Sequence, residues 1–310
     1  MHFTAADWAV LGMYAAALFL SGFFARWKGG TGAEDYILSG RKLTLPAFTA
    51  TLVATWYGGI LGVGEYSYLY GISNWVVFGF PYYVFAVLFA FVFAQRVRES
   101  MALTIPDQLG KHYGSAVAVA GSVLVFFISS PAPYVFMQAL LLQVLTGWPF
   151  IACIAAGTAI SILSLYGGGF RSVVRMDRVQ FTLMFGGFAL MLAFLIPEKG
   201  IDIFFSGDFP HHALTLTGGR SWQYILVWFF IALWTLVAPQ FHQLTLSASS
   251  PAVARRGILL SVLFWFVFDG MTTLTGLYAR ALLPVLERPA MAYPLLAEAV
   301  LPPIAKALFF

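Results

Sequence analysis

Four glycines are concentrated in the apolar stretch 45–71, LPAFTATLVATWYGGILGVGEYSYLYG. Gly58, Gly59, Gly62 and Gly64 lie within seven positions, and each glycine in a helix interior costs roughly 1 kcal/mol relative to alanine. We therefore expect a helix that is broken near the middle of a membrane, where irregular backbone must be buried or line a wet cavity. Such a break exposes carbonyl oxygens to a cation and amides to a solute. The alternative is a glycine-rich face that lets helices approach closely.

Two acidic residues, Glu65 and Asp269, fall in the interior of predicted membrane spans, away from their ends. An acid at the bilayer centre costs roughly 2.5–3.5 kcal/mol, so each should face protein or water. Glu65 either contacts a solute or cation at the outer mouth, or accepts hydrogen bonds from amides of the broken helix. Asp269 is followed one helical turn later by Thr272 and Thr273, which favours a buried hydrogen bond between helices.

The composition indicates which class of protein must position these residues. The chain has 310 residues, of which 60% are hydrophobic and only 10% are charged, whereas soluble domains carry about 25% charged residues. Apolar runs of about 20 residues predict helices and not the weaker alternation of a barrel. We expect an all-α integral membrane protein in which residues 1–310 form a single transmembrane domain with no nucleic-acid partner.

About eight transmembrane helices are predicted. They cover residues 6–24, 45–71, 74–94, 117–145, 150–166, 179–196, 224–239 and 257–284. With the N-terminus outside, the predicted inner loops hold twelve Lys and Arg residues and the outer ones hold four. Because cytoplasmic loops carry an excess of basic residues, this orientation in the cytoplasmic (plasma) membrane is favoured.

Two predicted inner segments carry helix-start signals. Thr104 can cap a short helix that starts at Pro106. In the run GGGFRSVVRMDRVQ, three glycines end one helix, and Asp177 lies where the next begins. An acid at a helix N-terminus is favoured by the helix dipole, and Gln180 stands in a suitable position for a capping arrangement.

Taken in order along the chain, these segments resemble the sodium:solute symporter family, whose members take up sugars, amino acids, vitamins or small carboxylates with sodium. The matching pieces are Asp-Tyr-x-x-Ser-Gly-Arg at 35–41, Tyr-Leu-Tyr-Gly at 68–71, Thr-Ile-Pro-Asp at 104–107, the Gly-Gly…Asp-x-x-Gln run ending at Gln180, Gln-x-x-Leu-Ser-Ala from Gln243, and Gly-x-x-Ala-Arg from Gly276. They cover nearly the whole chain. The chain departs from the family pattern at Leu244 and Ser249, where an arginine and a lysine are usual.

The resemblance implies two inverted five-helix repeats preceded by one extra N-terminal helix. Segment 45–71 would be core helix 1, and segment 224–239 would be core helix 6. The chain would hold core helices 1–7 and stop before core helix 8, whose hydroxyls help to bind sodium in the family. Three alternatives follow: the sequence is a fragment, its reading frame is truncated, or a further chain segment supplies the missing helices.

The resemblance also implies a set of site residues. Sodium, the coupling ion, would bind the backbone carbonyls of Leu52 and Thr55, with no other metal and no organic cofactor. The substrate-binding candidates are Ala54, Trp56, Gly58, Gly59, Glu65 and Trp234. Family members that bind polar substrates often have amide or acid side chains at the positions of Gly58 and Gly59. The glycines of this chain therefore favour a bulkier or less polar solute. Tryptophans such as Trp234 are also common in interfacial belts and in packing.

Two functions remain in competition. The first is sodium-coupled symport of a small organic solute by alternating access across the cytoplasmic membrane. The second is a transporter-like sensor or input domain of a signalling protein, which a soluble domain further along the chain would identify. An enzyme is not expected, because the predicted spans contain no paired nucleophile and base and no metal cluster.

Overall fold

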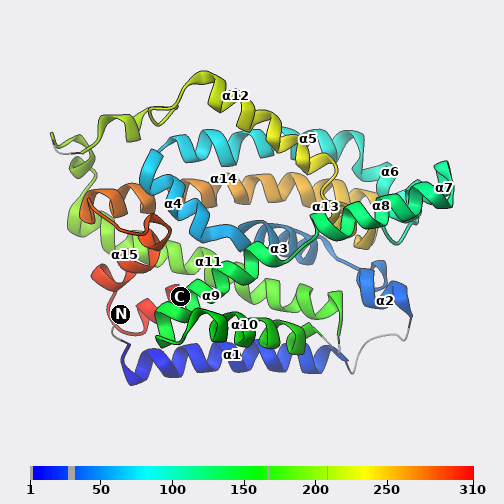
Figure 1. The fold of residues 1–310 in the computed structure, drawn as a ribbon, viewed down its shortest axis with the longest axis horizontal. Coiled ribbons are helices and arrows are strands. Elements are labelled where there is room, and N and C mark those ends of the chain that lie inside the picture. The colour runs from blue at the N-terminus through cyan, green and yellow to red at the C-terminus, as the bar shows by residue number, and fades with distance from the viewer. Residues whose placement is uncertain (1–2, 27–31, 166–167, 208) are drawn as a thin grey trace.

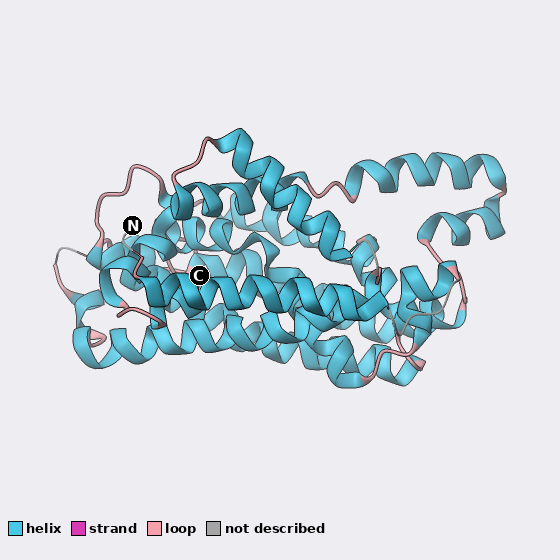
Figure 2. Cartoon of the chain, turned by 90° about the horizontal axis from the view of Figure 1, so that it is seen from below, coloured by secondary structure: helices cyan, strands magenta, loops and turns pink. Residues whose placement is uncertain are grey.

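The computed structural model describes every residue except 1–2, 27–31, 166–167 and 208. Within this described part the protein is helical and has no β-strand, only one isolated bridge between Leu43 and Ala248 (Figure 2). The α-helices are α1 (Ala5–Arg26), α2 (Ala33–Leu38), α3 (Leu45–Trp56), α4 (Ile60–Tyr70), α5 (Phe80–Val92), α6 (Ala94–Glu99), α7 (Ile105–Tyr113), α8 (Ser115–Ile128), α9 (Ala132–Thr146), α10 (Phe150–Leu165), α11 (Phe170–Lys199), α12 (Trp222–Ile231), α13 (Pro239–Ser247), α14 (Pro251–Leu282), α15 (Ala292–Val300) and α16 (Ala305–Phe309).

Short 3₁₀-helical or π-helical segments connect several of these helices. They are η1 (Ser39–Arg41), η2 (Tyr57–Gly59), the π-helical η3 (Trp75–Gly79), η4 (Asp202–Phe205), η5 (His211–Leu214), η6 (Ala232–Leu236) and η7 (Pro289–Met291).

Six helical segments are long and apolar enough to cross a membrane. They are Leu45–Tyr70, Trp75–Val92, Ser115–Thr146, Phe170–Lys199, Trp222–Ser247 and Pro251–Leu282. The other two predicted spans coincide with shorter apolar helices, Ala5–Leu20 and Phe150–Leu163. An integral membrane protein is the class that these helices indicate.

Three of the long segments are interrupted near their middles. In the glycine-rich segment, α3 and α4 are joined by the 3₁₀ turn η2, where the break was predicted. The segment of α12 and α13 is interrupted at η6, after which Pro239 starts α13. The predicted continuous span 117–145 is instead divided into α8 and α9. Because Pro131 has no N–H to donate, the helix cannot pass through it without losing a hydrogen bond.

The helices with the most buried faces lie at the centre of the molecule. Helix α14 packs against α3, α4 and α5, and α11 packs against α3 (Figure 1). Glycines permit this closeness: a Cβ atom at Gly257 would lie 2.3 Å from the ring of Phe48, and one at Gly276 would lie 2.5 Å from Ser67. The core around α3 is therefore rigid, while α7 and α8 project from the bundle (Figure 1).

A strap of α2 and η1 precedes α3 and is fastened by one buried arginine. The guanidinium of Arg41 donates to Glu34 Oε1 (3.0 Å) and to the carbonyl oxygens of Leu246 (3.2 Å), Met101 (3.1 Å) and Ala102 (3.0 Å). Backbone hydrogen bonds from Leu43 N to Ser247 O and from Ser249 N to Leu43 O continue the attachment. The predicted inner loop thus joins α3 to the end of α13 and to the α6–α7 link.

Candidate functional site

A cavity of about 480 Å³ lies where the three interrupted segments meet. It receives residues from α3 and η2, from both sides of the α8–α9 interruption, and from η6, α13 and α14. The lining residues are Leu52, Thr55, Trp56, Tyr57, Gly59, Gly62, Val63, Phe78, Tyr82, Ile128, Ser130, Pro133, Tyr134, Met137, Trp234, Gln240, Phe241 and Asp269. This volume is within the range of sites that hold small molecules.

Aromatic rings form much of the cavity wall, and Trp56 connects them. The ring centroid of Trp56 lies 4.9 Å from that of Tyr82, in a T-shaped arrangement, and 5.8 Å from that of Phe241. On another side, Trp265 lies 5.1 Å from Trp56. Edge-to-face pairs of this kind restrain the rings, so the wall of the cavity is preorganised.

Asp269 is the one charged side chain among the described lining residues. It is 4% exposed. The hydroxyl of Tyr57 donates to Asp269 Oδ1 at 2.6 Å, and the hydroxyl of Tyr83 donates to Oδ2. The carboxyl group therefore links α14 to η2 and to α5, which confirms the predicted hydrogen bond between helices. The sequence did not indicate that Asp269 would also lie at the cavity wall.

The turn η2 changes the hydrogen-bond register of the backbone. The amide of Tyr57 bonds to the carbonyls of Ala54 and Thr55, and not to one four residues earlier. A change from the α-helical to the 3₁₀ register removes an amide donor from the preceding turn. The carbonyl of Val53 thereby loses the Tyr57 amide as a donor, within one turn of Leu52 and Thr55, which lie against the cavity.

A second buried acid, Asp177, was interpreted from sequence only as a helix-start residue, and that interpretation was wrong. Helix α11 begins at Phe170, directly after Gly169, so Asp177 lies two turns inside it. Its side chain is 6% exposed and neighbours Thr51 of α3. Asp177 Oδ2 and Thr51 Oγ1 are buried and interact with each other, and in the described chain neither has a further hydrogen-bond partner. The sequence does contain a signal for a buried acid here, because Asp177 lies just before a long apolar run that continues the same helix.

The structure brings together most of the predicted site residues. Leu52, Thr55, Trp56, Gly59 and Trp234 line the cavity. Gly58 lies beside it, since a Cβ atom there would stand 2.7 Å from the ring of Tyr134.

Ala54 and Glu65 are not among the lining residues of this cavity. Glu65 is exposed and lines a separate cavity of about 520 Å³ with Gln143, Glu287 and Arg288. The other cavity residues, including Tyr82, Tyr134 and Gln240, carried no sequence signal, because they come from helices that meet only in the folded protein.

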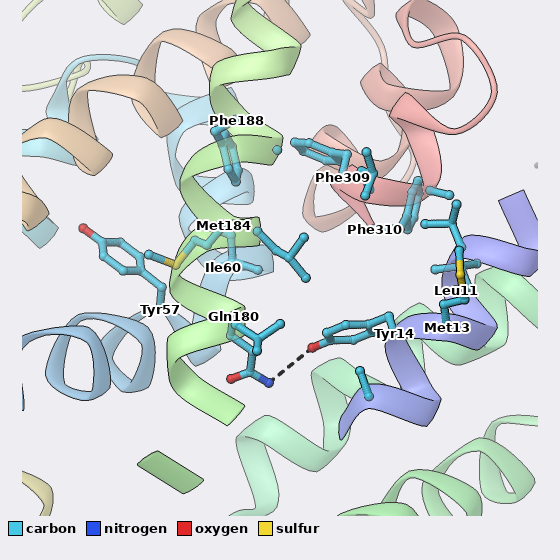
Figure 3. A pocket seen from close by; sticks show the side chains of 17 residues that line it. Leu11, Met13, Tyr14, Tyr57, Ile60, Gln180, Met184, Phe188, Phe309 and Phe310 are labelled. Carbon is cyan, nitrogen blue, oxygen red and sulfur yellow. Dashed lines mark hydrogen bonds between the residues drawn. The ribbon is translucent and has the colours of Figure 1, made fainter. Parts of the chain in front are cut away.

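Two further cavities adjoin the central one. A cavity of about 350 Å³, bordered by Tyr36 and Ile37 of the strap, shares Thr55 and Gln240 with the central cavity. An apolar cavity of about 430 Å³ lies between α1, α11 and α16. There Gln180 Nε2 donates to the hydroxyl of Tyr14 at 3.3 Å (Figure 3).

The fold defines a class of protein. It is similar to the structure described as a substrate-bound outward-open state of a Na⁺-coupled sialic acid symporter, with a TM-score of 0.81 and 18% sequence identity. The match covers 99% of this chain and 68% of that one. The chain therefore has the fold of a Na⁺-coupled symporter, with interrupted helices around a central cavity.

The chain belongs to the sodium:solute symporter family, whose sequence profile matches residues 36–310. It is 27% identical over 209 residues to the sodium/myo-inositol cotransporter of Mus musculus and 30% identical over 195 residues to the sodium/proline symporter of Escherichia coli (strain K12). These matches cover 64% and 58% of this chain, and 29% and 38% of the respective relatives. The chain thus spans less than half the length of these curated relatives. The family is one of membrane transporters and not of enzymes.

Proposed function

We propose that this chain forms part of a sodium-coupled symporter that moves a small organic solute across the cytoplasmic membrane by alternating access, with its N-terminus outside. The observation that carries the proposal is the meeting of the interrupted segments at one cavity. The family membership supports sodium as the coupling ion. No observation favours the sensor function.

For the solute we propose the central cavity, with Trp56, Gly58, Gly59 and Trp234 in contact with it and Ala54 behind them. The interrupted helices support this assignment, because half-helix ends present free backbone groups at the centre of a transporter. Glu65 would act in the separate cavity that it lines with Gln143, Glu287 and Arg288, and not in the central one.

For sodium we propose the carbonyl oxygens of Leu52 and Thr55. Carbonyl oxygens are suitable hard ligands for a small hard cation. The buried pair of Asp177 and Thr51 supports the proposal, because a hydroxyl does not neutralise a buried acid, whereas a cation would. In the family pattern, hydroxyls of core helix 8 complete the set.

The test is accumulation of candidate solutes in proteoliposomes by a version of the protein extended through core helix 10, with sodium outside compared with potassium outside. We expect accumulation with sodium only, and a lower apparent sodium affinity in the Asp177→Asn variant. The matched control is Asp202→Asn, an exposed acid in the loop after α11, which should leave accumulation unchanged. Equal accumulation in sodium and potassium across all solutes would contradict sodium coupling.

A further inference from the structure

We propose that the solute of the central cavity carries an ammonium group, and that Asp269 is its counter-charge. The inference rests on the proposed function in one respect, namely that this cavity is the solute site. It names a substrate class, the small organic cations and zwitterions, from the charge and the chemistry of the cavity wall.

The charge of the wall has one sign. Among the described residues that line the cavity, Asp269 is the one charged residue, and none of them is Lys, Arg or His. A solute whose main group is a carboxylate would lie near an acid with no cationic side chain to receive it, and like charges in a low-dielectric site repel strongly. An ammonium group would instead supply the missing positive charge.

Asp269 is positioned to accept more hydrogen bonds than it now does. Each carboxylate oxygen has about two lone-pair sites, and each accepts one bond from a tyrosine, Tyr57 or Tyr83. The tyrosines hold the group in place. Gln240, also in the wall, has a buried amide oxygen with no partner in the described chain. These two acceptor groups favour a ligand that donates hydrogen bonds.

The aromatic residues of the wall are suitable for the same ligand. Trp56, Tyr82, Tyr134 and Trp234 all line the cavity, and cations with alkyl substituents bind to the faces of such rings. Trp56 and Tyr82 are in contact at an interplanar angle of 70°, so a ligand beside this pair meets rings of two orientations. An aromatic wall with a single acid is typical of a site for an organic ammonium.

A bare inorganic cation fits this part of the cavity less well. Small hard cations prefer several oxygen ligands at once, whereas Trp56, Phe78 and Phe241 contribute apolar surface to this wall. The volume of about 480 Å³ is also far larger than one ion requires. We therefore assign the Asp269 side of the cavity to the organic solute.

The experiment compares ligands of nearly equal shape and different charge. Choline, the uncharged 3,3-dimethyl-1-butanol and the anionic 3,3-dimethylbutanoate are titrated into the protein in lipid nanodiscs, together with ethanolamine as a smaller ammonium. Tryptophan fluorescence is the readout, since Trp56 and Trp234 line the cavity. At least one ammonium compound should bind about tenfold or more tightly than the alcohol. Binding of the alcohol or the acid at least as tight as that of both ammonium compounds would overturn the proposal.

Variants assign the preference to Asp269. Asp269→Asn should remove the preference for choline over the alcohol without weakening the alcohol, and Asp269→Glu should retain it. Asp202→Asn is the matched control and should behave as the parent. If Asp269→Asn does not fold, Trp234→Leu replaces it and should weaken choline severalfold more than the alcohol.

The same variant separates this proposal from the proposed function. If Asp269→Asn abolishes sodium-driven accumulation while the ligand preference persists, Asp269 serves the ion and the substrate-class proposal fails, although symport stands. If the ammonium preference depends on Asp269 but no solute accumulates with sodium, the substrate class holds and sodium coupling fails.

Discussion

Substitution of the two adjacent glycines of η2 should have opposite effects, although the sequence makes them look equivalent. An alanine Cβ at position 58 would lie 2.7 and 2.8 Å from two ring carbons of Tyr134. Ordinary contact between carbon atoms is about 3.5–4.0 Å, so the ring must move by about 1 Å. Overpacking of this size costs about 1–3 kcal/mol. Because Tyr134 lines the cavity, Gly58→Ala should also weaken solute binding.

Gly59→Ala is the matched control in the same turn. The nearest atom to a Cβ there is the methyl of Met137 at 3.8 Å, and the backbone (φ −96°, ψ 25°) is open to alanine. Alanine at a compatible glycine position stabilises a protein by about 0.4–1 kcal/mol. The two variants should therefore differ by at least about 1.5 kcal/mol, with Gly58→Ala the less stable.

The assay is thermal unfolding of the purified variants in nanodiscs, followed by solute binding at equilibrium. At about 2–4 °C per kcal/mol, the apparent melting temperatures should be separated by roughly 3 °C or more. In a double-mutant cycle, Tyr134→Ala should relieve the penalty at position 58 and have no such effect at position 59. Equal melting temperatures for Gly58→Ala and Gly59→Ala would refute the close approach of α9 to η2.

Two further predictions concern the strap and the orientation. Arg41→Ala should destabilise the protein by about 3 kcal/mol or more, because it leaves buried carbonyl oxygens without donors. The control is Arg255→Ala at an exposed position, which should change the melting temperature little. Equal losses of stability in the two variants would contradict the role of Arg41 in holding the strap. In a Cys153→Ser background, an impermeant thiol reagent applied to intact cells should label a cysteine at the exposed position of Ser206 and not one at that of Lys111, and the reverse pattern would overturn the orientation.

The sequence alone was sufficient for the class of protein and for the position of the main break. Hydrophobic runs determine membrane helices because the bilayer requires each backbone group to be bonded within its own helix. Glycines at 58 and 59 weaken the helix locally, and η2 lies there. Trp234 was one of the expected substrate-binding candidates, and it lies in η6 and lines the central cavity.

What the sequence could not determine was which side chains from distant helices share one space. Asp269 was correctly expected to bond to another helix, but its partners, Tyr57 of η2 and Tyr83 of α5, have no spacing in the sequence that relates them to it. Asp177 was assigned to a helix start because the local pattern allowed it, whereas its position against Thr51 depends on the packing of α11 on α3. Local patterns determine whether a segment is helical and where it breaks; only the packing of the helices decides which residues those breaks bring together around one cavity.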